Sequence, residues 1–189
     1  MEQTLKTRRL VLAAIFGALI IVMTVVPFTG YIQYGGVIEI TTLHIVVMLG
    51  AVTLGWKWGA ILGGIWGVTC LIRAFTNPLW AIFINPLISV LPRILVGVIA
   101  GLLFIGLKKL KLNKYLAAML TAVITSIAHT AMVLSAMYFF GGTLNPYADF
   151  YETFKAVFTT IIGINGLIEV IAAAVLVPAI YTRTNKFSI

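Results

Sequence analysis

Long apolar stretches follow one another along this chain, separated by short polar or turn-forming segments. A helix that crosses the hydrocarbon core of a bilayer needs about 20 apolar residues, and six stretches approach that length. They cover residues 9–27, 41–54, 56–74, 82–107, 115–140 and 154–181. The second is short and joins the third across Gly55. The pattern predicts an all-α integral membrane protein, a six-transmembrane-helix bundle forming one domain over residues 1–189.

The composition supports this prediction and narrows the function. The chain is 61% hydrophobic and only 10% charged, with a mean hydropathy of +1.11. It has no phosphate-binding P-loop motif and a single aspartate, so we expect no nucleotide hydrolysis by the chain itself. We therefore expect a membrane subunit that binds a solute and depends on partner proteins for energy.

The basic residues predict the orientation in the membrane, because cytoplasmic loops retain Lys and Arg. Ten of them flank the apolar stretches on one side if both termini are cytoplasmic: Lys6, Arg8, Arg9, Lys57, Lys108, Lys109, Lys111, Lys114, Arg183 and Lys186. The opposite loops hold Glu39, Asp149 and Glu152 against Arg73 and Lys155. The net charge of +8 is thus explained by topology and contacts with lipid headgroups, without nucleic acid.

Small residues mark the predicted helix contacts. Glycines recur every fourth position at 55, 59, 63 and 67, and again at 97 and 101. Such ridges let helix backbones approach closely in a membrane, so we interpret them as internal packing seams. The first stretch has a similar strip, for which we predict docking of another membrane protein; it comprises Ala14 and Ala18, beside Ala13 and Gly17.

Polar side chains at membrane depth are costly and mark candidate sites. They are Asn85, Arg93, His129, Asn165 and Glu169, with His44 near the outer end of the second stretch. One interpretation is structural: Arg93 pairs with Glu169, and His129 bonds a backbone carbonyl. The other is functional, because an arginine grips a carboxylate through two hydrogen bonds, and amide and imidazole groups bind hydroxyl or amide groups. Pro86 and Pro92 bend this region, which favours a cavity beside it.

Enzyme functions find little support. There is no Gly-x-Ser-x-Gly turn and no His-Glu-x-x-His motif. We expect a non-enzymatic chain without a cofactor or a bound metal.

Several segments together resemble a known family. They are the basic start with Ala14-x-x-x-Ala18, residues 42–50 (TLHIVVMLG), the glycine-rich third stretch and residues 85–94 (NPLISVLPRI). In these the chain is similar to the substrate-binding S-components of energy-coupling factor (ECF) vitamin transporters. The resemblance implies a six-helix protein of the bacterial plasma membrane that captures a vitamin from outside. It also implies a transmembrane coupling protein, which the Ala14 and Ala18 strip contacts, and two cytoplasmic ATPase subunits.

Within that family the segments look most like the pantothenate group. The resulting hypothesis places the carboxylate of pantothenate on Arg93 and its polar middle on Asn85, His129 and Asn165. Folate, riboflavin, pyridoxine and a thiamine precursor stay open as ligands. The first two would stack on aromatics such as Trp66, Trp80 and Tyr138, and a cationic ligand would prefer Glu169. A self-sufficient secondary carrier or channel is the alternative from another class, although the two halves show no convincing repeat.

Overall fold

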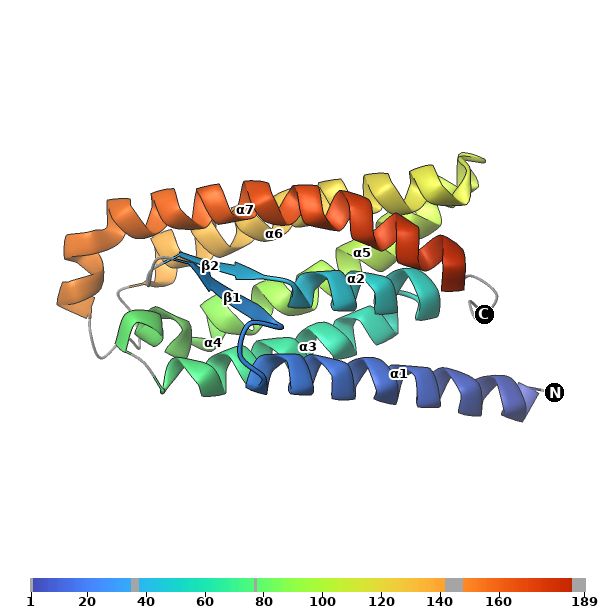
Figure 1. Ribbon diagram of the computed structural model, residues 1–189, viewed down its shortest axis with the longest axis horizontal. Coiled ribbons are helices and arrows are strands. Elements are labelled where there is room, and N and C mark those ends of the chain that lie inside the picture. The colour runs from blue at the N-terminus through green and yellow to red at the C-terminus, as the bar shows by residue number, and fades with distance from the viewer. Residues whose placement is uncertain (1, 35–37, 77, 142–147, 185–189) are drawn as a thin grey trace.

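The computed structural model describes residues 2–34, 38–76, 78–141 and 148–184, and it is a bundle of helices with one small hairpin (Figure 1). The longer helices are α1 (Glu2–Val25), α2 (Leu43–Leu54), α3 (Trp56–Ala74), α5 (Leu91–Lys109), α6 (Lys114–Phe140) and α7 (Ala148–Thr184). The shorter elements are β1 (Tyr31–Tyr34), β2 (Ile38–Thr41), the 3-10 helix η1 (Pro78–Ile84) and α4 (Pro86–Ser89). The mainly helical prediction is confirmed, with the hairpin as an addition.

Among the described residues, four helical segments are long and apolar enough to cross a membrane. They are Gln3–Val25, Pro86–Lys109, Lys114–Phe140 and Gly163–Thr184. The helix α2 has only 12 residues, in agreement with the short second stretch of the sequence. The segments support an integral membrane protein of several spans.

The predicted stretch 82–107 is not one helix, and this expectation was wrong in detail. It is divided into the end of η1, the short α4 and the long α5. The break follows from proline, which has no N–H to continue the helical hydrogen bonding; Pro86 begins α4 and Pro92 stands in the first turn of α5. Asn85 caps α4, because its side chain accepts a hydrogen bond from the Leu87 N–H at 3.0 Å.

The glycine ridge of α3 packs against α5, as the sequence predicted. A Cβ atom at Gly59 would meet the backbone of Gly97, and one at Gly63 would meet the carbonyl of Arg93. At Gly67 the added atom would lie 2.7 Å from the Cα of Val90. The two backbones approach so closely only because these side chains are absent. The contact fixes the part of α5 that carries Arg93.

The strip on α1 is divided by the packing of that helix along the edge of the bundle (Figure 1). Ala13 and Gly17 are buried, and a Cβ atom at Gly17 would lie 3.2 Å from Ile65 of α3. Ala14 and Ala18 are exposed. The prediction that all four form a docking surface therefore needs correction, since Ala13 and Gly17 face the bundle.

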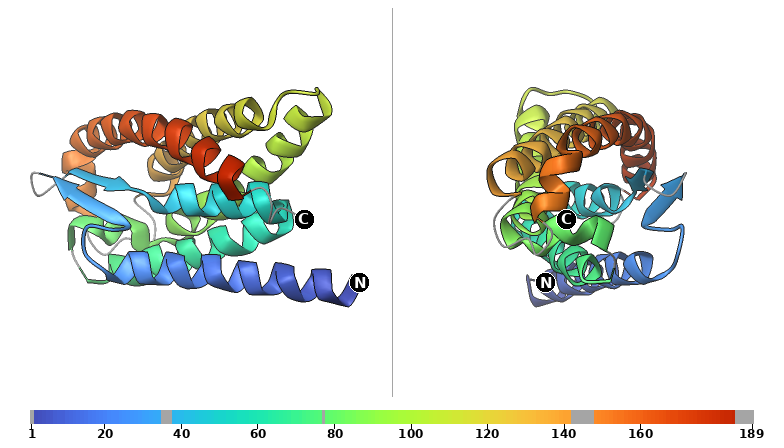
Figure 2. Two further views of the ribbon diagram at one scale, coloured as in Figure 1. Left: turned by 45° about the vertical axis from the view of Figure 1, so that its right-hand side comes forward. Right: turned by 90° about the vertical axis from the view of Figure 1, so that its left-hand side faces the viewer.

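The hairpin was not expected from the sequence, which predicted only a loop. Its strands are antiparallel, with Tyr31 opposite Thr41 and Gln33 opposite Glu39. It lies at one end of the bundle, near α4, whereas the start of α1 and the end of α7 lie at the other end (Figures 1 and 2). The hairpin thereby brings side chains from the segment between α1 and α2 against the ends of other helices.

Candidate functional site

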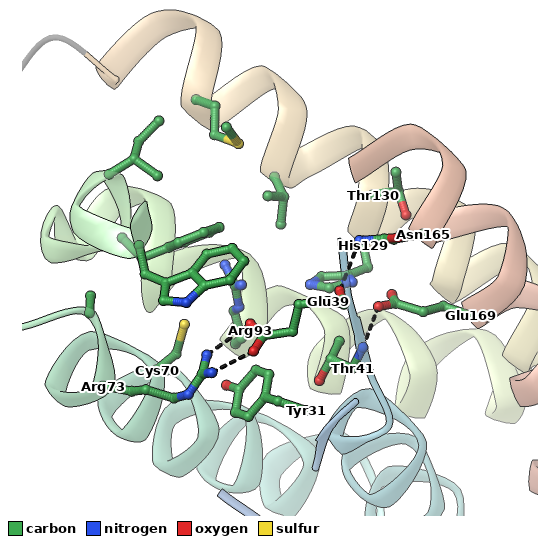
Figure 3. A pocket seen from close by; sticks show the side chains of 16 residues that line it. Tyr31, Glu39, Thr41, Cys70, Arg73, Arg93, His129, Thr130, Asn165 and Glu169 are labelled. Atoms are coloured by element: carbon green, nitrogen blue, oxygen red, sulfur yellow. Dashed lines mark hydrogen bonds and ion pairs between the residues drawn. The ribbon is translucent and has the colours of Figure 1, made fainter. Parts of the chain in front are cut away.

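A cavity opens at the hairpin end of the bundle (Figure 3). Its volume is about 90 Å³, several times the roughly 10–15 Å³ that one water molecule requires. The hairpin, α3, η1, α5, α6 and α7 all contribute to it. The lining residues are Tyr31, Glu39, Thr41, Cys70, Arg73, Ala74, Trp80, Ile82, Phe83, Arg93, His129, Thr130, Val133, Met137, Asn165 and Glu169.

The first cation of the cavity, Arg73, has its charge compensated. Its two terminal nitrogens donate to both carboxylate oxygens of Glu39, with Nη1 at 2.8 Å from Oε2. Its guanidinium also lies 4.2 Å from the ring centre of Tyr31, a distance typical of a cation–π contact. This bidentate pair fastens the hairpin to the last turn of α3.

The second cation, Arg93, is buried without a carboxylate partner. Only 5% of the residue is exposed, and its Nη1 donates to the carbonyl of Ile88 at 2.6 Å. Its Nε has no hydrogen-bond partner in the described part of the chain. The guanidinium lies 5.3 Å from the ring of Trp66 and 5.2 Å from that of Phe83. Among the described residues no acidic side chain pairs with Arg93, so a positive charge is available to a ligand.

The structural alternative from the sequence, an ion pair between Arg93 and Glu169, is wrong. Glu169 accepts instead from the backbone N–H of Thr41 at 2.7 Å, and this bond ties α7 to the hairpin. Asn165, one turn earlier on α7, donates through Nδ2 to the carbonyl of Glu39 at 2.9 Å. The carboxyl group of Glu169 and the amide of Asn165 thus line the cavity on the side opposite α3.

Three further buried polar atoms of this cavity have no hydrogen-bond partner among the described residues. They are Nε1 of Trp80, Nε2 of His129 and Oδ1 of Asn165; His129 and Asn165 are 5% and 6% exposed. Leaving such groups unsatisfied costs about 1–3 kcal/mol each, so the arrangement favours a ligand with hydroxyl or amide groups. No three His, Cys, Asp or Glu side chains come together as a metal site in the described part of the chain.

Four residues proposed from the sequence lie outside the cavity lining. His44 and Trp66 are buried behind it: the His44 ring stacks on His129 at 6.2 Å, and Trp66 donates from Nε1 to the Tyr31 hydroxyl at 3.2 Å. Asn85 has a structural role, since its side chain caps α4 and donates to the Phe140 carbonyl at 3.2 Å. Tyr138 is 67% exposed, so its predicted stacking on a ligand needs correction.

The hairpin side of the cavity was not predicted from the sequence. Tyr31, Glu39 and Arg73 were assigned to loops, because polar and aromatic residues near helix ends are ordinary in membrane proteins. Burial raises the pKa of the Tyr31 phenol well above its usual range, and the Cys70 thiol adds to this, while Arg93 and Arg73 oppose it. The hydroxyl is therefore neutral. The available signal for this side of the cavity was a pair of opposite charges in the predicted outer loops, Glu39 and Arg73.

Comparison with known proteins shows which family the chain resembles. Residues 8–181 match the family model described as "ECF transporter, substrate-specific component". The pantothenate transporter PanT of Leuconostoc mesenteroides is 38% identical over 105 residues, which span 52% of this chain and 52% of that protein. The pantothenic acid transporter PanT of Lactococcus lactis is 30% identical over an alignment of 204 positions, covering 96% of this chain and 95% of the relative.

Proposed function

The chain belongs to the substrate-specific components of ECF transporters, multi-pass proteins of the cell membrane, and from this premise we propose that it captures pantothenate. The observation that carries the proposal is the buried guanidinium of Arg93, which lines the cavity without a carboxylate partner among the described residues. Pantothenate has one carboxylate, and a planar guanidinium binds a carboxylate with two parallel hydrogen bonds.

The rest of the cavity suits the rest of this molecule. Pantothenate carries an amide and two hydroxyl groups, which match the free Nε2 of His129 and the free Oδ1 of Asn165. Its two geminal methyl groups need an apolar wall, and Ile82, Phe83 and Val133 supply one. Both named relatives are described as pantothenate transporters, which supports the same ligand.

The proposed topology has six membrane helices and both termini in the cytoplasm. The start of α1, the end of α7, the α2–α3 junction and the α5–α6 connection lie at the same end of the bundle (Figure 1). These segments carry the basic residues that the sequence assigned to the cytoplasm, except for Lys186, which lies outside the described residues. The cavity, at the other end, then faces the outside.

Transport in this proposal is driven by partners. A transmembrane coupling protein docks on the exposed Ala14 and Ala18 of α1, and two cytoplasmic ATPases supply the energy. The small side chains of Ala14 and Ala18 leave a shallow surface between larger exposed neighbours such as Val11 and Ile15. Such a surface permits close approach of another helix. The chain itself acts as a binding subunit and not as an enzyme.

Calorimetric titration of the purified chain with a panel of vitamins tests the ligand. We expect tight binding of pantothenate without ATP, and much weaker binding of folate, riboflavin and pyridoxine. Folate and riboflavin carry broad aromatic rings. The lining offers few aromatic partners for such rings, namely Tyr31, Trp80 and Phe83. Tight binding of another vitamin would mean that this vitamin, and not pantothenate, is the ligand. Absence of binding by a folded sample would contradict the capture function.

A further inference from the structure

A second cavity lies beside the first, toward the end of α1. Its volume is about 190 Å³. Tyr31 and Arg73 line both cavities, so these two side chains form the partition between them. The remaining lining residues of this outer cavity are Thr24, Val25, Val26, Pro27, Phe28 and Gln33.

The cation in the partition is reachable from the outer cavity, and its counterion can be replaced. The Arg73 side chain is 23% exposed, against 8% for the Glu39 side chain that pairs with it. Glu39 has a second donor, because Nε2 of Gln33 lies 3.3 Å from its Oε1. If another carboxylate displaced Glu39 from Arg73, Gln33 would still donate a hydrogen bond to Glu39.

The partition also leads toward the inner cation. Arg73 lies over the face of Tyr31, and the hydroxyl of Tyr31 accepts from Trp66. Arg93 lies 5.3 Å from the ring centre of that same Trp66. Arg73 and Arg93 also line the same inner cavity, so an anion that leaves Arg73 can reach Arg93 through that space.

We propose that Arg73 is an outer binding site for the carboxylate of the ligand, which takes the place of Glu39 there before it moves inward to Arg93. This inference rests on the proposed capture of a carboxylate-bearing vitamin. Exchanging one carboxylate for another keeps an ion pair on Arg73 throughout, and the displaced Glu39 keeps the hydrogen bond from Gln33, so an anionic ligand can open the partition without leaving the guanidinium unpaired. A neutral solute of the same shape has no such exchange and must wait for the Arg73–Glu39 pair to open by itself.

Two substitutions that break the same ion pair separate this proposal from a purely mechanical role. Arg73→Gln removes the cation, whereas Glu39→Gln removes its competitor and leaves the cation. Association rates of pantothenate are measured by stopped-flow fluorescence on the purified full chain, alongside pantothenol, in which an alcohol replaces the carboxylate. We expect Arg73→Gln to slow pantothenate by about tenfold and Glu39→Gln to speed it by several-fold, within the range that electrostatic attraction gives association rates.

Pantothenol and a third variant serve as controls. Arg73→Gln should leave pantothenol no slower than in the parent chain, and Arg73→Lys, which keeps the charge, should retain most of the pantothenate rate. If Arg73→Gln and Glu39→Gln shift pantothenate in the same direction, or if Arg73→Gln slows both ligands equally, the pair only fastens the hairpin and the proposal is wrong. Failure of the parent chain to bind pantothenate at equilibrium would instead remove the proposed function, and this inference with it.

Discussion

The two arginines of the inner cavity differ in how their charge is compensated. Arg73 has a bidentate carboxylate partner in Glu39, whereas Arg93 is more deeply buried and, within the described part of the chain, donates a hydrogen bond only to a backbone carbonyl. Burial of an uncompensated charge costs several kcal/mol even after relaxation. A carboxylate ligand on Arg93 removes that cost, so binding gains more there than at Arg73. For this reason the proposal places the carboxylate of the bound ligand on Arg93 and not on Arg73.

The position of Arg93 depends on a single missing side chain in α3. A methyl group at Gly63 would meet the carbonyl of Arg93. Gly63→Ala should therefore lower stability by about 1–3 kcal/mol and weaken ligand binding, because the displaced backbone belongs to Arg93. Thermal unfolding and titration in detergent measure both effects.

A matched control for this prediction is Gly106→Ala in α5. An added Cβ atom at Gly106 has nothing within 4 Å, and alanine favours a helix over glycine by roughly 1 kcal/mol. The control should melt at the same temperature or slightly higher, with unchanged binding. Equal behaviour of the two variants would show that the α3–α5 contact is not as close as described.

Site residues were predictable from the sequence where depth made them conspicuous. Arg93, His129, Asn165 and Glu169 stand alone in apolar helices, and all four line the cavity. Asn85 was misassigned, because an asparagine before a proline is equally suited to binding a ligand and to capping a helix. The roles of Arg93, His129, Asn165 and Glu169 in ligand binding stay predictions.

At the scale of the elements, hydropathy predicted the helices and local chemistry decided their ends. Most of the apolar stretches coincide with one helix each, because a membrane span needs a length fixed by the bilayer, whereas the stretch 82–107 is divided at Pro86 and Pro92. The hairpin escaped prediction, since strands of four residues leave almost no periodic signal. Its place is set by contacts distant in sequence, such as Thr41 with Glu169 and Glu39 with Asn165. The hairpin side of the cavity, formed by Tyr31, Glu39 and Thr41, therefore could not be foreseen.

The helix α1 allows a test of the proposed coupling to partners. Replacing Ala14 and Ala18 by leucine fills a surface that is exposed in the isolated chain. We expect uptake by the complete transporter in cells to be lost, because the coupling protein no longer approaches, while the purified variant binds pantothenate as before. Cellular uptake and calorimetry measure the two properties separately.

Val22→Leu, on another exposed position of α1, is the matched control and should keep both uptake and binding. Loss of ligand binding in the variant with both substitutions, Ala14→Leu and Ala18→Leu, would mean that these positions support the fold of the bundle. Unchanged uptake would place the docking surface on another helix.

At the scale of the whole molecule, the described basic residues predicted to be cytoplasmic and the candidate binding cavity lie at opposite ends of the bundle. The hairpin, which lines the cavity together with Arg73 and Arg93, lies at one end of the bundle, and the start of α1 and the end of α7 lie at the other (Figures 1 and 2). A chain so arranged can hold an anionic solute at one face of a membrane and present a basic surface at the opposite face. This division agrees with a capture subunit whose energy comes from partner proteins.

The most direct test of this account compares pantothenate and pantothenol binding to the parent chain and to Arg93→Ala by calorimetry. We expect the variant to lose about 2–5 kcal/mol of pantothenate affinity, roughly 30-fold or more, and to bind pantothenol nearly as well as the parent does. The parent should discriminate between the two ligands, and the variant should not. A folded Arg93→Ala chain that still binds pantothenate with the affinity of the parent would contradict the account.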